Sequence, residues 1–332
     1  MRKISTKIML SIMVCSIIVS VLLGTLSIIK SSSYIKKEAN EKLEFKAAAE
    51  AGIFNDQIRQ VESGVHTLKL AVINTFDLRK VNNDIIYVKE EYHKEVGSLL
   101  SDFVKTTPVQ GVYLTFNPEL LGNKAYEIWY ADEKLDGNVV WVDSDPDDDL
   151  IEWFEDEEEM EYYYAPIEAN KGIWLSVSED IVLGIDVVTY SVPIYKNDIL
   201  IGTLGIDISI EDIKDKIKKM ELYETGYGFL MDMDYDYIYH PKYVGEDETY
   251  GLRNDKDGDL TFVIDEMDKN NKGYIELNLN GVEKVLAYSK LYNGWTVAVE
   301  VPKSEILKPI GQHIRHNGSN KFTCIKCFNR SC

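Results

Sequence analysis

The stretch VVTYSVPIYKNDILIGTLGIDI at residues 187–208 decides the fold of this chain. Both halves are rich in Val, Ile, Thr and Tyr, which favour strands, and the Lys196-Asn197-Asp198 segment between them is typical of a tight turn. We therefore expect residues 187–195 and 199–208 to pair as an antiparallel hairpin.

Strand-like runs also lie on both sides of this hairpin. They occupy residues 109–117, 126–131, 138–142 and 173–177 before it. After it come YGFLMDMDYDYIYHP (227–241), LTFVIDEM (260–267), KGYIELNL (272–279), EKVLAYSKL (283–291) and GWTVAVEVP (294–302). Gly, Asn, Asp and Pro residues separate the runs and mark turns. Residues 145–170 read as a helix, and Ser209 with Asp212 forms a capping box that predicts another helix over 210–220. This order predicts an α+β fold of two modules in series.

The N-terminal segment IMLSIMVCSIIVSVLLGTLSII, residues 8–29, contains no charged residue. It is long enough to cross a bilayer, which needs about 20 apolar residues. Three basic residues before it favour a cytoplasmic N-terminus for residues 1–7, whereas Lys30, Lys36 and Lys37 after it weaken that orientation. A cleaved signal peptide is the alternative, but its apolar region would be shorter. We expect a single-pass anchor in the cell membrane with the rest of the chain extracytoplasmic.

Residues 30–74 continue directly from the anchor. They are rich in Ala, Glu, Lys and Leu, contain no proline, and repeat apolar residues three to five positions apart. This pattern predicts a long helix that rises from the membrane. Residues 87–104 are predicted to form a second helix.

Charge and cysteine content restrict the function. The 332 residues include 56 acidic and 36 basic ones, so the formal net charge is −20. An acidic surface repels phosphate backbones, which excludes nucleic acid as a partner and favours cations. Cys15 lies in the apolar run and the other three cysteines lie at the C-terminus, so no disulfide framework is expected in the folded region.

A series of short motifs resembles the double Cache sensor domain of bacterial receptors, most often methyl-accepting chemotaxis proteins. The motifs are FNPEL (116–120), IWYAD (128–132), YYYAP (162–166), KGIWLSVSED (171–180), TYSVPIY (189–195), IGTLGIDIS (201–209) and GYGFLMD…YIYHP (226–241). The resemblance covers residues 35–302. It implies two PAS-like modules with antiparallel sheets, a membrane-distal one at 75–210 and a membrane-proximal one at 211–302, with the ligand pocket in the distal module.

The resemblance also implies a set of pocket residues. Members that bind amino acids grip the ligand ammonium with an Asp, which Asp207 matches, and the ligand carboxylate with an Arg, whose place Met160 takes. The remaining positions carried over from the family are those of Tyr162, Tyr163, Trp174, Ser178 and Asp180. Ser178 takes the place of a tyrosine. Tyr163 and Trp174 can equally be core residues, and Asp207 can cap the following helix.

The missing Arg changes the expected ligand. Without a guanidinium group no bidentate clamp holds a carboxylate, and the surrounding glutamates repel one. Asp207 with aromatic walls suits a cation instead, because aromatic faces attract cations. We therefore expect an amine or amino-acid-like cation.

Other activities have little support in the sequence. Residues 255–259 lack the glycine position of a calcium loop, and neither a phosphate loop nor a nucleophile elbow occurs. We expect no enzyme activity, no cofactor and no metal. A sensor histidine kinase or cyclic-dinucleotide enzyme remains an alternative parent protein, and a surface-anchored hydrolase or an adhesion module an alternative function. Homodimerisation stays open.

The tail, residues 303–332, departs from the family pattern. A complete receptor places a second apolar helix near Ile306, whereas residues 307–332 contain no membrane-length run and no acidic residue. His313, His316, Cys324 and Cys327 mimic a zinc site with short spacing. We expect a shifted reading frame or a truncated gene rather than a metal finger.

Overall fold

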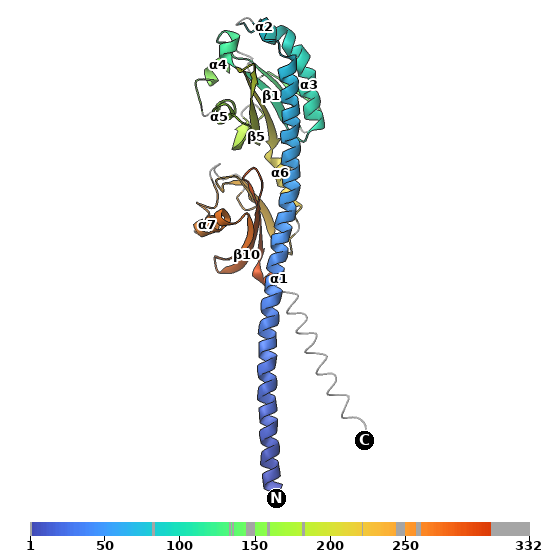
Figure 1. The fold of residues 1–332 in the computed structure, drawn as a ribbon, viewed down its shortest axis with the longest axis vertical. Coiled ribbons are helices and arrows are strands. Elements are labelled where there is room, and N and C mark those ends of the chain that lie inside the picture. The colour runs from blue at the N-terminus through green and yellow to red at the C-terminus, as the bar shows by residue number, and fades with distance from the viewer. Residues whose placement is uncertain are drawn as a thin grey trace.

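The computed structural model describes residues 2–81, 84–132, 134, 136–143, 150–157, 160–180, 183–220, 222–243, 250–256 and 260–306. Two α+β modules are stacked along one long helix, α1 (Arg2–Thr75), which continues past both of them toward the N-terminus (Figure 1). The distal module contains a six-stranded sheet and the proximal module a five-stranded one. The predicted fold class, two α+β modules behind a long helix, is therefore confirmed.

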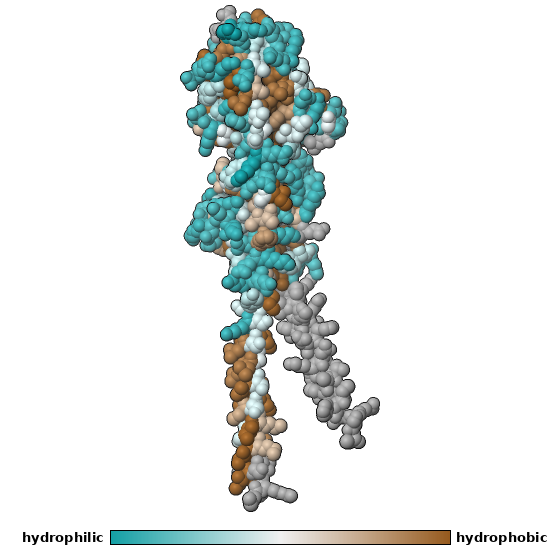
Figure 2. Space-filling view, turned by 45° about the vertical axis from the view of Figure 1, so that its right-hand side comes forward, coloured by the Kyte–Doolittle hydropathy of each residue, from teal (hydrophilic) through white to brown (hydrophobic). Residues whose placement is uncertain are grey.

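Helix α1 has two parts with opposite surfaces. In its C-terminal half, residues three, four or seven apart are almost fully buried on one side, among them Leu43, Ala47, Phe54, Val61 and Val72. This stripe packs against strands of both sheets, which is how an amphipathic helix gains stability. Residues 8–29, toward the N-terminus, are exposed and uncharged, and brown and white atoms cover this part of the helix in Figure 2. By length and composition this part of α1 is able to cross a membrane.

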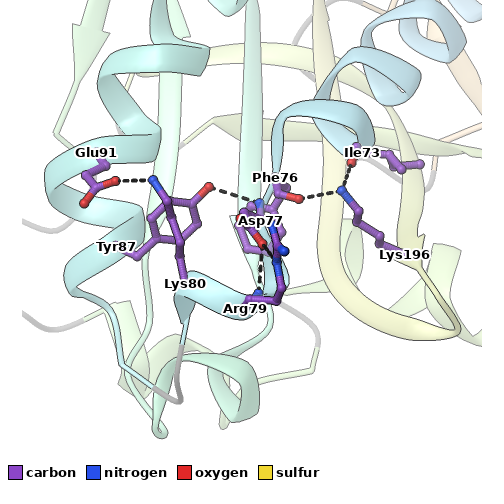
Figure 3. A network of polar contacts seen from close by, with 8 residues as sticks. All are labelled: Ile73, Phe76, Asp77, Arg79, Lys80, Tyr87, Glu91 and Lys196. Atoms are coloured by element: carbon purple, nitrogen blue, oxygen red, sulfur yellow. Dashed lines mark hydrogen bonds and ion pairs between the residues drawn. The ribbon is translucent and has the colours of Figure 1, made fainter.

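A lysine from the distal sheet caps the end of α1. Nζ of Lys196 donates hydrogen bonds to the carbonyl oxygens of Ile73, at 2.7 Å, and Phe76, at 2.6 Å (Figure 3). A helix leaves its last carbonyls without partners, so a cation is favourable there. Asp77 then begins the next turn, because its carboxylate accepts from the backbone N–H of Arg79 and its own N–H donates to the Tyr87 hydroxyl.

The distal sheet is antiparallel throughout. Its order is β3 (Val140–Val142), β2 (Glu127–Ala131), β1 (Gly111–Phe116), β6 (Ile199–Ser209), β5 (Ile185–Lys196) and β4 (Ile173–Asp180). The expected hairpin is β5–β6, and its turn residues Asn197 and Asp198 have φ angles of 52° and 63°, which Asn and Asp tolerate.

Helices cover both faces of the distal sheet. Helix α1 and α3 (His93–Thr106), which a π-helical turn (Tyr87–Tyr92) precedes, lie on one face. Helix α5 (Glu161–Ala169) packs on β4, β5 and β6 from the other side (Figure 1). The short segments of this module are α2 (Leu78–Val81), a 3-10 helix (Pro118–Leu121) and α4 (Leu150–Trp153).

The proximal module repeats this plan below the distal one. Its sheet order is β8 (Tyr237–Tyr239), β7 (Tyr227–Met231), β11 (Thr296–Pro302), β10 (Val282–Lys290) and β9 (Lys272–Leu279), again antiparallel. Helix α6 (Ile210–Lys218) links the two sheets, and α7 (Thr261–Lys269) and α8 (Lys303–Ile306) complete the module.

Three sequence expectations need correction. Residues 260–267 were expected to form a strand, but Thr261–Lys269 form helix α7, whose buried residues Val263, Ile264 and Met267 lie at helical spacing. Residues 150–170 do not form one helix, because α4 and α5 are separated by a non-helical segment. A continuous helix would place like charges four positions apart, at Glu152 and Asp156 and at Glu157 and Glu161, which is destabilising. Strand β4 runs to Asp180 rather than ending at Val177. The Ser209 cap is confirmed, since its hydroxyl accepts from the Glu211 N–H at 3.2 Å.

Several sequence expectations concern residues outside the described part of the chain. Residues 145–149, at the start of the expected helix, belong to this group, as do 257–259 of the rejected calcium loop. The whole tail from residue 307, including His313, His316, Cys324 and Cys327, lies there too.

Candidate functional site

Strand register gathers polar side chains on one face of the distal sheet. Gly111 pairs with Asp207, Tyr113 with both Trp129 and Gly205, and residue 115 with residue 127. Paired residues point to the same face and side chains alternate along a strand, so Tyr113, Trp129, Glu127 and Asp207 share the face that α5 partly covers. We call this surface the polar face. The opposite face is apolar and packs on α1 and α3.

Asp207 on β6 is a buried carboxyl group on the polar face. Its side chain is 5% exposed, and one carboxylate oxygen accepts a hydrogen bond from the Thr189 hydroxyl at 2.6 Å. Burial raises the pKa of Asp207 to about 8, and the charges of Asp180 and Glu127 act in the same direction. A carboxyl group at this position therefore changes its charge close to neutral pH.

Glu127 on β2 is a second buried carboxylate on the polar face, with 8% exposure. The Thr115 hydroxyl of the neighbouring strand donates to it at 2.5 Å, and the Tyr162 hydroxyl of α5 lies 3.5 Å from the same oxygen.

Two aromatic rings lie near both carboxylates on the polar face. The rings of Tyr113 and Tyr162 meet edge to face, with centroids 5.1 Å apart and an interplanar angle of 80°. Desolvation raises the pKa of both hydroxyls, and the charges of Asp207 and Glu127 raise it further. Tyr113 can lie flat on the sheet because its partner is Gly205: a Cβ there would sit 2.2 Å from the ring.

The indole of Trp129 lies next to Asp207. Its Nε1 is 2.9 Å from where a Cβ on Gly111 would be, and Gly111 is the residue opposite Asp207. Trp129 is 5% exposed, and its Nε1–H has no hydrogen-bond partner. Buried donors are almost always paired, so this N–H, which has no partner among the residues that the structure describes, is able to donate to a bound polar group.

The structure separates the residues that the sequence placed in the pocket. Tyr162 and Asp207 lie together, and the Asp180 charge acts on Asp207, although its carboxylate also accepts from the Leu183 N–H at 2.9 Å. Tyr163 turns away and packs against Phe154 and Tyr164. Met160, which takes the place of the family arginine, is fully buried. Ser178 is exposed on β4.

Trp174 lies on the opposite, apolar face of the sheet. Its Nε1–H donates to the Glu62 carboxylate of α1 at 2.8 Å. Its ring contacts Tyr190 of the distal sheet and Trp295 of the proximal module. It therefore cannot line the same site as Asp207.

Sequence reasoning did not place Glu127, Tyr113, Trp129 or Thr189 in the site. A signal for Glu127 was present, since it is the one charged residue in the strand EIWYA, and a buried strand rarely carries a charge without a purpose. The other three could be found only from the register that places them beside Asp207.

Comparisons with known proteins agree with this architecture. The model of the Cache domain family (dCache_1) matches residues 31–310, whereas no curated protein matches the chain. The extracellular domain of mmHK1S-Z3, assigned as a histidine kinase, is 17% identical with a TM-score of 0.65, over 83% of this chain and 98% of that one.

Two chemoreceptor structures are similar as well. The ligand-binding domain of the Campylobacter jejuni chemoreceptor Tlp3, in complex with L-norvaline, is 18% identical with a TM-score of 0.58, over 83% of this chain and 96% of that one. The structure entitled methyl-accepting chemotaxis protein X is 14% identical with a TM-score of 0.58, over 81% of this chain and all of that one. At such identities these structures support the fold, and the match over residues 31–310 shows that the chain belongs to the Cache domain family.

Proposed function

We propose that this chain is the extracytoplasmic sensor region of a transmembrane signalling protein of the chemoreceptor type, and that its distal module binds a small cation such as an amine. The observation that carries the proposal is the buried carboxylate of Asp207, which faces aromatic side chains on the polar face. Asp207 takes part in none of the ion pairs found among the described residues. A cationic ligand supplies the missing charge.

The composition of the polar face favours an ammonium group over a carboxylate. Asp207 and Glu127 are acceptors when ionised, and the faces of Tyr113 and Tyr162 attract cations by about 0.5–2 kcal/mol each. The position at which amino-acid-binding members of the family carry an arginine holds Met160, which offers no donor to a carboxylate.

Membrane attachment supports the sensor role. The exposed apolar part of α1 is able to span a bilayer, and α1 then contacts both sheets without a break. A ligand that favours one arrangement of the distal module can therefore act on the same helix that enters the membrane. The sensor of a histidine kinase or of a cyclic-dinucleotide enzyme would share this arrangement, and the output region decides between these parents.

The test is calorimetric titration of the full chain in detergent with primary amines, zwitterionic amino acids and organic acids. We expect amines to bind, and Asp207→Asn to weaken that binding at least tenfold. Asp265→Asn on the exposed side of α7 makes the same change of formal charge and should leave binding unchanged.

Three results would contradict the proposal. Tight binding of zwitterionic amino acids with no binding of amines would assign this chain the kind of ligand that the Tlp3 structure contains. No saturable binding of any small molecule would favour an adhesion module, and turnover of a substrate would favour a surface-anchored hydrolase.

A further inference from the structure

The two sheets share a strand order, so positions in one module have counterparts in the other. Strands β8, β7, β11, β10 and β9 follow one another as β2, β1, β6, β5 and β4 do. Tyr227 at the start of β7 pairs with Glu300 on β11, just as Gly111 at the start of β1 pairs with Asp207 on β6. Glu300 is therefore the proximal counterpart of Asp207.

The neighbouring positions repeat as well. Two residues along each strand an aromatic residue pairs with a small one, Tyr113 with Gly205 in the distal sheet and Phe229 with Ala298 in the proximal sheet. Phe229 and Ala298 belong to the apolar cluster that contains the buried side chains of α7, and residues two positions apart on a strand share a face. Both carboxylates therefore lie on the face of their sheet that α1 does not cover.

The two carboxylates differ in their partners. Asp207 takes part in none of the ion pairs found among the described residues. Glu300 is 5% exposed, and its Oε1 accepts from Nζ of Lys284 at 2.6 Å, where the lysine side chain is 12% exposed. The Tyr227 hydroxyl donates to the same oxygen, and Nζ of Lys242, on a more exposed side chain, lies 3.9 Å from it. A buried ammonium from β10 thus neutralises the proximal carboxylate.

A small cavity adjoins Glu300 on this face. The side chains of Tyr227, Phe229, Tyr237 and His240 are part of its wall. Its volume is about 240 Å³, including the part open to solvent, whereas ligand pockets usually measure roughly 300–1,000 Å³. Space of this size suits ordered water better than a second ligand beside the carboxylate.

We propose that Glu300 and the Tyr227 hydroxyl form a second ammonium site, in the proximal module, and that the chain fills this site with its own Lys284. The end of the lysine side chain, from Cγ to Nζ, has the composition of propylamine, so the class of ligand that fits is a primary alkylammonium. The proximal module is thereby held in an occupied state that needs no small molecule. This inference goes beyond the proposed function and does not depend on what the distal module binds.

The experiment removes the lysine side chain beyond Cβ and offers it back as propylamine. Lys284→Ala is prepared in the full chain in detergent, with Asp207→Asn added so that the distal module does not contribute to amine binding. We expect the melting temperature to fall by about 6 °C or more, because breaking a buried ion pair is costly. Millimolar propylamine should restore at least half of this loss. Lys269→Ala, at an exposed ion pair of the same module, is the matched control and should show neither effect.

Two further variants define the site. Lys284→Met keeps a side chain of similar length without the charge, so it should also melt lower, but propylamine should not rescue it because the methionine fills the space. Adding Glu300→Gln to Lys284→Ala should abolish the rescue. Equal rescue by 1-propanol, which has no charge, or rescue of Lys284→Ala no greater than that of Lys269→Ala, would overturn the ammonium site.

Acetylation of the native protein, followed by mass spectrometry, gives a readout that needs no folded variant. Lys284 should react at least tenfold more slowly than Lys269, because its ammonium is buried and held at Glu300. Equal rates would overturn the inference. The proposed function is tested separately: if propylamine acts alike on the native protein and on Asp207→Asn, the distal cation site fails while the proximal one stands.

Discussion

Replacing Asp207 with asparagine should change how the stability of the protein depends on pH. The native pKa of Asp207 is raised from 3.8 to about 8, mainly by burial, so between these pH values the native state holds a proton that the unfolded state has lost. The contribution of Asp207 to the free energy of unfolding is therefore fully present below pH 3.8, and it is lost as the pH rises through 8. The groups that face Asp207 are Thr189, Asp180, Tyr113, Tyr162 and Glu127.

The size of the effect follows from that shift. Where the native carboxyl is protonated and the unfolded one ionised, the free energy of unfolding falls by about 1.4 kcal/mol per pH unit. From pH 6 to pH 8 the slope flattens as the native group begins to ionise, so the loss amounts to about 2 kcal/mol. Asparagine cannot ionise, so this contribution is absent from Asp207→Asn.

The assay is urea unfolding of both proteins in detergent, followed by circular dichroism, at pH 6, 7 and 8. Over this range we expect the free energy of unfolding of the native protein to fall by about 2 kcal/mol more than that of Asp207→Asn. The exposed-site variant Asp265→Asn controls for the change in net charge and should run parallel to the native protein. Parallel curves for the native protein and Asp207→Asn would show that Asp207 titrates at its ordinary pKa, and the burial argument would be refuted.

Three further outcomes follow from the same structure. The affinity for a monoamine should rise up to tenfold per unit between pH 6 and 8, because the cation must displace the Asp207 proton; a pH-independent affinity in calorimetry would contradict this. Gly202→Ala should lower the free energy of unfolding by more than about 3 kcal/mol, because φ is 154° and the new Cβ would lie 1.9 Å from the carbonyl oxygen of residue 115. Gly52→Ala, in open space on α1, should instead raise the free energy of unfolding by about 0.5–1 kcal/mol. Thermal or urea unfolding measures both effects. Glu62→Ala should cost about 2 kcal/mol, because that carboxylate accepts from both Trp174 and Tyr292, and unchanged urea unfolding would show that this link between the modules is not stabilising.

Local chemistry determined most of the secondary structure. The β5–β6 hairpin was predicted because strand-forming runs flank Asn197 and Asp198, which accept the left-handed backbone of the turn. Helix α1 was predicted from its uncharged start and its apolar stripe, both of which are periodic properties of the chain. The order of helices and strands along the chain was enough to predict two α+β modules in series, because elements joined by short connections usually pack next to each other.

The candidate site depended on pairings that no local pattern contains. The resemblance to a family supplied Asp207 and Tyr162, but it also placed Trp174 beside them, and the fold puts that indole on the other face against Glu62. Strand β4 has a bulge, where its register with β5 shifts between Trp174 and Val177. A bulge interrupts the regular alternation of side chains between the two faces of a sheet.

The sequence by itself thus determined the anchor-like helix, the hairpin and the two-module order, because each is set by residues close together along the chain. Only the tertiary structure brought Glu127 and Trp129 to Asp207, through strands that are about 80 residues apart in sequence and joined by the register of β1. Long-range register decides which side chains share a face, and therefore which charges a ligand meets.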